Sequence, residues 1–255
     1  MKKWIFILTL AVLLGLCIFC AWYTVTYVFE QDQAGSLYDT LAKDARASDK
    51  PEPGQDEPIP SGMAVNGDSG SDVDINKVVL KNPDTIGWLR IRGTHIDYPI
   101  MQSKSPEFYL KRDFNRQTSK YGTPFLDERC GQDSDNWIVY GHAMKDGTMF
   151  ADLQKFKSSE FCSETEITLT SVQPQKTGKY QVFAVLWTDT GNDIYQFVEA
   201  GDEQYFNDYI RCITENSLYQ TKELPQYGDE LMTLVTCDND RTDGRIVVVA
   251  YKSNK

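Results

Sequence analysis

The sequence predicts a mainly β domain, a barrel or a sandwich, that follows an apolar N-terminal segment. The predicted folded part holds eight short runs rich in β-branched and aromatic residues, with turn-forming residues between them. These runs cover residues 86–92, 95–102, 122–127, 136–141, 165–171, 180–188, 231–237 and 245–251. Many short strands at this spacing, with few helical patterns among them, are typical of β-barrels and β-sandwiches.

Three helical patterns accompany these strands. "DINKVVLKN" (74–82) precedes the first run, and "MFADLQKF" (149–156) follows the fourth. The third pattern, residues 202–216, places four apolar side chains on one helical face, namely Phe206, Tyr209, Ile210 and Ile213. We expect this helix to cover the β domain with that face.

The chain is acidic, and its charge is unevenly distributed. Its 255 residues carry a formal net charge of −11, so no basic stripe is available to bind a nucleic acid. Residues 30–76 hold eleven Asp and Glu against three Lys and Arg, a net charge of −8. Most of the acidity therefore belongs to the segment between the apolar N-terminus and the folded domain.

Residues 4–29 predict a membrane anchor. These 26 residues contain no charged side chain, and about 20 apolar residues suffice for a helix to cross a bilayer. Lys2 and Lys3 precede the run and acidic residues follow it, so the positive-inside rule places the N-terminus in the cytoplasm and the rest outside. A cleaved signal peptide is the alternative, but its apolar region usually spans about 7–15 residues before a small-residue cleavage site.

The chain thus divides into four predicted parts: a cytoplasmic tip (1–3), a transmembrane anchor (4–29), an acidic extracellular stalk (30–73) and a folded domain (74–255). Within the stalk, residues 33–47 can form a short helix with Leu37 and Leu41 on one face. Residues 48–72 are rich in Pro, Gly, Ser and acidic residues, which is typical of extended, mobile linkers.

Two predicted strands end where residues suited to nucleophilic catalysis stand. Cys237 ends the run 231–237, and His142 directly follows the run 136–141. A cysteine and a histidine brought together supply a thiolate nucleophile and an acid for the leaving group, which attack on an amide carbonyl requires. His95 opens a strand after a Gly-Thr turn, and we expect it at the surface.

An arginine strengthens this prediction. Arg245 opens the run that follows Cys237, and in an antiparallel pair these two residues lie side by side. A guanidinium there can stabilise the oxyanion that acyl transfer forms. Arg241 lies in the middle of the intervening loop, where Asp238 and Asp240 are either partners that orient the histidine or ordinary turn residues.

The remaining cysteines of the folded domain indicate no metal site. Cys130, Cys162 and Cys212 lie far apart in the sequence, without the paired spacing of zinc ligands. We therefore expect no metal and no cofactor. An exported protein can form disulfides, so a Cys162–Cys212 bond is an alternative to free thiols. We expect Cys237 to be a free thiol in either case.

Three ordered motifs resemble those of the sortase family. "TLVTC" (233–237) resembles the sortase TLxTC signature, "YGH" (140–142) the segment of the catalytic histidine, and "RIVVVA" (245–250) the strand that opens on the essential arginine. Three further segments look like those of class B sortases, as does the long insertion before the TLxTC strand; they are residues 82–102, 121–127 and 141–156. The resemblance covers residues 74–255.

The resemblance implies an eight-stranded sortase-type β-barrel with an N-terminal helix and a helix-containing insertion before the strand of the cysteine. It implies a membrane-anchored cysteine transpeptidase of a Gram-positive bacterium, which cleaves a C-terminal sorting motif of a secreted protein. The acyl fragment would pass to an amine of a peptidoglycan precursor or to a pilin lysine. Carried onto this chain, Cys237 forms the thioester, His142 acts as acid and base, and Arg245 stabilises the oxyanion.

Four more residues are candidates for substrate contacts. In class B relatives the region that corresponds to residues 188–197 walls the peptide groove, which implies contacts from Asn192, Ile194 and Tyr195. Thr236 precedes the nucleophile and either hydrogen-bonds the peptide or faces the other side of its strand. Two other functions stay open: a membrane-anchored cysteine endopeptidase that releases the acyl group to water, and an inactive surface domain that only binds peptides.

Overall fold

The computed structural model describes residues 2–46, 73–189, 191, 193–221, 223–237 and 243–253. The chain divides into two compact units, residues 1–40 and residues 41–255. The elements of the second unit are α2 (Ile75–Lys81), β1 (Thr85–Ile91), β2 (Asp97–Met101), η1 (Phe108–Lys111), β3 (Phe125–Leu126), β4 (Asn136–Tyr140), η2 (Phe150–Lys157), α3 (Ser159–Glu164), β5 (Ile167–Ser171), η3 (Pro174–Lys176), β6 (Gly178–Asp189), η4 (Asp193–Tyr195), α4 (Glu203–Glu215), β7 (Leu231–Cys237) and β8 (Gly244–Lys252).

The first unit is formed by the helix α1, which spans Lys2–Arg46 and so continues into the second unit. By length and composition α1 could cross a membrane. The helix predicted for residues 33–47 is not a separate element: its described residues, 33–46, are the C-terminal part of α1. The predicted extended linker, residues 48–72, lies outside the described residues.

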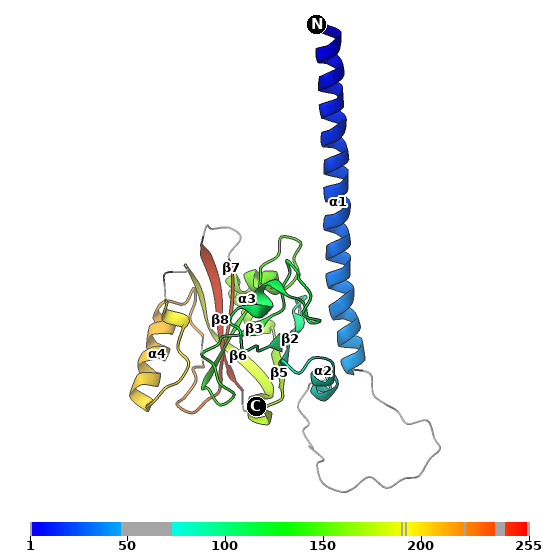
Figure 1. Cartoon of the computed structure of the whole chain (residues 1–255). Coiled ribbons are helices and arrows are strands. Elements are labelled where there is room, and N and C mark those ends of the chain that lie inside the picture. The colour runs from blue at the N-terminus through cyan, green and yellow to red at the C-terminus, as the bar shows by residue number, and fades with distance from the viewer. Residues whose placement is uncertain are drawn as a thin grey trace, which may run out of the picture. The chain divides into compact units, whose positions relative to one another are not determined.

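The second unit is built on a closed barrel (Figure 1). Among the described residues, eight strands pair in the order β1-β2-β3-β4-β7-β8-β6-β5. The pairs β2–β3 and β4–β7 are parallel, and the other six are antiparallel. The predicted eight-stranded barrel with an N-terminal helix and an insertion helix before the cysteine strand is confirmed.

The strands β7 and β8 are buried on both faces. From Leu231 to Thr236 every side chain of β7 is buried, and in β8 so is each one from Ile246 to Ala250. The 3₁₀ helix η2 packs against both strands. This double burial explains why their sequences read as nearly continuous apolar runs rather than as alternating ones.

The segment 149–156, predicted to be helical, forms the 3₁₀ helix η2. Phe150, Leu153 and Phe156 are fully buried, and their spacing of three residues matches the three residues per turn of a 3₁₀ helix. The helix predicted at residues 202–216 is α4, which lies outside the barrel against β6 (Figure 1). All four of its predicted apolar side chains are buried.

The last turn of α1 is held against the barrel within the second unit. Arg46 Nη2 donates to both carboxylate oxygens of Asp97, at 2.6 and 2.8 Å. Trp88 Nε1 donates to the same carboxylate at 2.7 Å, and the Asp74 backbone N–H donates to the Ala45 carbonyl at 2.8 Å. The compact unit therefore includes residues 41–46, which the sequence analysis placed in the stalk.

Candidate active site

The barrel topology brings three strand ends together at one edge. The parallel pairing of β4 with β7 sets Tyr140 opposite Val235, so both strands end on the same side. The antiparallel partner β8 starts there, and its register sets Arg245 opposite Cys237. His142 follows Tyr140 by two residues. The backbone thus places all three predicted catalytic positions at one end of the barrel.

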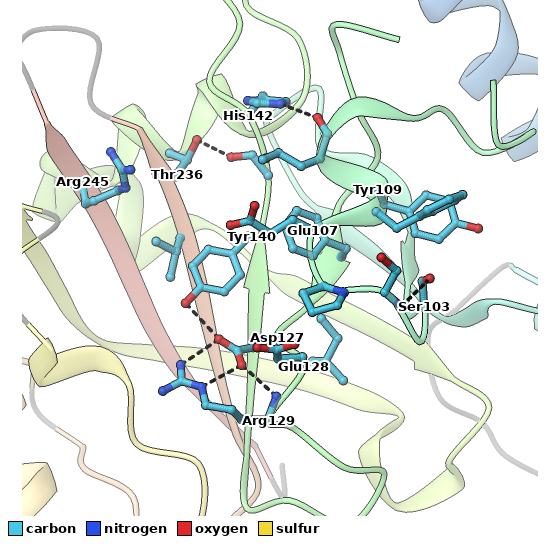
Figure 2. A pocket seen from close by; sticks show the side chains of 18 of the residues that line it. Ser103, Glu107, Tyr109, Asp127, Glu128, Arg129, Tyr140, His142, Thr236 and Arg245 are labelled. Carbon is cyan, nitrogen blue, oxygen red and sulfur yellow. Dashed lines mark hydrogen bonds and ion pairs between the residues drawn. The ribbon is translucent and has the colours of Figure 1, made fainter. Parts of the chain in front are cut away.

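A pocket of about 560 Å³ opens at this end (Figure 2). Its walls come from the loop after β2, from the ends of β3, β4 and β7, and from the start of β8. His142, Thr236 and Arg245 lie toward one end of the pocket in Figure 2, and Asp127 and Arg129 toward the other. The lining is mixed, with aromatic rings beside charged groups.

The imidazole of His142 is held by a backbone carbonyl. Its Nε2 lies 2.7 Å from the carbonyl oxygen of Leu110. Because a carbonyl can only accept, Nε2 carries a proton and donates it in this bond. The remaining ring nitrogen, Nδ1, is then the one left for proton transfer. The Phe150 N–H donates to the His142 carbonyl at 2.8 Å, which fixes the backbone of the same residue.

Two glycines permit the close packing around this histidine. Gly122 has φ +62°, and a Cβ there would lie 2.7 Å from the carbonyl oxygens of Tyr109 and Leu110. A Cβ on Gly141 would lie 2.7 Å from the buried ring of Phe150. Real Cβ atoms do not approach so closely, so a larger residue at Gly122 would displace the Leu110 carbonyl that holds the imidazole, and one at Gly141 would displace the Phe150 ring.

Arg245 lines the pocket and is half-buried. Its Nη1 donates to the Gly244 carbonyl at 2.9 Å. Cys237 is the last residue of β7, but its side chain lies outside the described part of the structure. The same holds for all of residues 238–242, which include Arg241 and the candidate orienting residues Asp238 and Asp240.

The structure places two of the four candidate substrate residues on the pocket. Thr236 lines it, but only 2% of this residue is exposed, and its Oγ1 donates to the Gly141 carbonyl at 2.8 Å. Its hydroxyl therefore ties β7 to the end of β4. Tyr195 also lines the pocket, whereas Ile194 is half-buried next to it in sequence. Asn192 lies outside the described residues.

A cluster around Asp127 was not foreseen from the sequence. The carboxylate accepts from Arg129 Nε and Nη2 at 2.8 and 2.7 Å, and from the Tyr140 hydroxyl at 3.1 Å. Burial alone would raise the pKa of Asp127, but the hydrogen bonds and the charge of Arg129 outweigh it and lower that pKa. Burial first, and then the charge of Asp127, raise the pKa of Tyr140. The cluster thus pairs a carboxylate with a neutral phenol on the pocket wall.

Other thiols and the second histidine lie in different surroundings. Cys130, Cys162 and Cys212 are free thiols in the structure, so the Cys162–Cys212 bond is not formed in it. Burial raises the pKa of Cys130 to about 11, which keeps it a thiol, and its Sγ donates to the Asn136 carbonyl at 3.3 Å. His95 is exposed, as expected, and its Nδ1 lies 2.9 Å from an Asp152 oxygen. Among the described residues, no three His, Cys, Asp or Glu side chains gather as metal ligands would.

Comparison with known proteins shows the family of this chain. Residues 89–253 match the sortase domain family. Over 250 residues the chain is 32% identical to sortase B of Listeria monocytogenes, covering 93% of this chain and 92% of that protein. A structure of Clostridium perfringens sortase B has a TM-score of 0.66 at 29% identity and covers 71% of this chain and 100% of that one. A Staphylococcus aureus sortase B–substrate complex has a TM-score of 0.62 at 31% identity, and the match covers 69% of this chain and 82% of that one.

The chain belongs to the sortase family of cysteine transpeptidases. Its curated relatives and its structural neighbours are sortases B, so within the family it is a class B sortase.

Proposed function

We propose that this sortase is anchored in the membrane by α1 and cleaves a C-terminal sorting motif of a secreted protein through a thioester on Cys237. The acyl group then passes to an amine of a peptidoglycan precursor or to a pilin lysine. The observation that carries the proposal is the β7–β8 register, which sets Arg245 opposite Cys237 beside a pocket that His142 also lines. A sortase B bound to a substrate and another bound to triglycine are consistent with a peptide donor and an amine acceptor.

The reaction follows from the chemistry of these three side chains. The Cys237 thiolate attacks the carbonyl carbon of the scissile amide, and the Arg245 guanidinium stabilises the oxyanion. Protonated His142 gives its proton to the leaving amine, so the C–N bond breaks and a thioester remains. An incoming amine loses a proton to His142 as it attacks the thioester carbon. The new amide forms and Cys237 leaves again as a thiolate.

The tautomer of His142 assigns these proton transfers to one atom. Because Nε2–H donates to the Leu110 carbonyl, Nδ1 takes and gives the proton in each half of the reaction. The backbone carbonyl thereby does what the carboxylate does in a Ser-His-Asp triad: it fixes the ring and its tautomer. Cys130 is a poor alternative nucleophile, because its burial disfavours the thiolate.

A panel of quenched fluorogenic peptides tests the proposal. The full chain in detergent is incubated with the panel, with and without triglycine, a diaminopimelate peptide or a lysine peptide. We expect cleavage of one motif class, and a mass-spectrometric product that joins the acyl fragment to one amine. Cleavage that yields only the free acid with every amine would support the endopeptidase instead. Binding without cleavage would support the inactive binding domain.

A further inference from the structure

The Asp127 cluster links three separate walls of the pocket. Asp127 follows β3, Tyr140 ends β4, and Arg129 Nη1 donates to Gln196 Oε1 at 2.8 Å. Gln196 directly follows Tyr195, the buried tyrosine that lines the pocket. One guanidinium therefore holds the Asp127 carboxylate with two nitrogens and the Tyr195 segment with the third (Figure 2 shows the Asp127 side).

This contact extends an anchor that begins just beyond Gln196. Asn136 Nδ2 donates to the Phe197 carbonyl at 2.7 Å, and its backbone N–H donates to the Val198 carbonyl at 3.0 Å. The Ala200 N–H donates to Asp135 at 2.7 Å. The segment is thus tied to the start of β4 at these residues, and Arg129 adds a tie on the side of Tyr195.

The geometry of the fork makes this tie specific to arginine. Nε and Nη2 face a single carboxylate while Nη1 points to the amide oxygen, and the three bonds are 2.7–2.8 Å long. A lysine ammonium is a point charge and cannot hold both partners in this planar arrangement. Asp127 is 8% exposed and also accepts from the Arg129 backbone N–H at 2.9 Å, so the fork starts from a fixed carboxylate.

We propose that Arg129 is a positioning residue that fixes the Tyr195 wall of the pocket and so sets the affinity for the peptide acyl donor. The inference rests on the proposed function, because it assigns a role in binding that reaction's first substrate. Arg129 acts through Tyr195 and does not touch the reacting atoms. Its loss therefore weakens substrate binding while the chemistry of Cys237, His142 and Arg245 proceeds as before.

Kinetics of four variants of the full chain test this with the best peptide of the panel. Arg129→Met and Gln196→Ala should each raise KM by about three- to tenfold, as expected for one partly solvated hydrogen bond to a charged group, with kcat within about twofold. Arg129→Lys should recover little of the loss. The double variant should have the KM of Arg129→Met alone, because both changes break the same tie.

The matched control is Arg211→Met on α4, which removes an exposed arginine that pairs with Asp208 at 2.7 Å. It should leave KM unchanged. An unchanged KM in Gln196→Ala, losses in the double variant that multiply, or a loss confined to kcat would overturn the proposal.

Hydrogen exchange of the free enzyme tests the same wall without any turnover. Backbone amides in a peptide that covers residues 193–199 should exchange about threefold faster or more in Arg129→Met than in the unchanged chain. In the control Arg211→Met they should exchange at the rate of the unchanged chain. Equal exchange in Arg129→Met and the unchanged chain would sink the inference. This measurement separates the two proposals. If no peptide is turned over, the proposed function fails, but hydrogen exchange still shows whether Arg129 fixes the Tyr195 segment.

Discussion

Two arginines follow Cys237, and their positions predict different roles. Arg245 lies opposite Cys237 in the β7–β8 ladder and lines the pocket, whereas Arg241 stands in the sequence among Asp238, Asp240 and Asp243. Arg245→Ala should lower kcat/KM by about 10²–10³-fold, the usual effect of losing an oxyanion donor. Arg245→Lys should recover little, because a point charge lacks the fork.

The companion variant is Arg241→Ala, which should cost less than about tenfold, as expected for a charge that at most steers the substrate. Steady-state rates with one peptide compare the variants directly. If the two alanine variants exchanged their effects, Arg241 would be the catalytic partner.

The two histidines give a second comparison between single residues. His142→Ala should abolish acyl transfer, because the leaving amine then loses the acid that the proposed reaction assigns to it. His95→Ala should leave the rate within about twofold, because His95 is exposed and pairs with Asp152, which does not line the pocket. Equal losses in both variants, measured in the same assay, would mean that the acid has been misassigned.

At the scale of elements, the junction between β4 and η2 depends on Gly141. A Cβ there would meet the ring of Phe150 at 2.7 Å, and that ring is fully buried. Gly141→Ala should destabilise the fold by about 1–3 kcal/mol through overpacking, and should lower kcat because His142 is the next residue. Thermal unfolding with and without peptide turnover measures both effects.

The matched control is Gly131→Ala, where a Cβ would meet only Ser134 Oγ at 3.7 Å. Gly131→Ala should shift the melting temperature by less than about 2 °C and should leave the rate of peptide turnover unchanged. A Gly141→Ala enzyme as stable and as fast as this control would contradict the packing described for the histidine.

The helix α1 carries the prediction about localisation. If its apolar part is an uncleaved anchor, the native protein should stay in the membrane fraction after a high-salt wash. Two arginines introduced at Leu13 and Leu14 should release it, because each costs about 2.5–3.5 kcal/mol at the centre of a spanning helix. The same two substitutions at Leu218 and Leu224, which are exposed in the second unit, serve as the control. A freely secreted, N-terminally processed form would overturn the anchor.

The positions of most strands were predictable from their runs of β-branched and aromatic residues. The prediction was less accurate where a glycine or a proline within such a run prevents backbone pairing. The run 122–127 reads as a strand, yet only Phe125 and Leu126 form β3. Gly122 has a positive φ and Pro124 lacks an N–H, so neither can extend the ladder. Helix η2 was predicted as a helix but not as a 3₁₀ helix, although its three-residue spacing carried that signal.

The candidate site was predictable to the extent that local motifs mark it. Cys237, His142 and Arg245 stand at strand ends, and the register then brings their positions together. The Arg129 cluster was not predictable, because Gln196 lies 67 residues from Arg129 and no periodicity relates them. The same applies to Leu110, whose contribution to the site is a backbone oxygen rather than a side chain.

At the scale of the whole molecule, a closed barrel serves as a rigid frame for three strand ends. Mixed strand directions are needed for this: β4 and β7 must run parallel to end together, and β8 must run against them to start there. Sites on such strands are held more precisely than sites on loops alone.

The central claim is that Cys237 carries the acyl group, and the most direct measurement is the intact mass of the enzyme after an acid quench. The full chain mixed with its peptide should gain the mass of the acyl fragment, on the tryptic peptide that contains Cys237, and should lose it when an amine is added. Cys237→Ala should show no adduct, whereas Cys212→Ala, which removes an exposed thiol, should show the same adduct as the unchanged chain. An adduct that persists in Cys237→Ala, or turnover without any adduct on Cys237, would contradict the account.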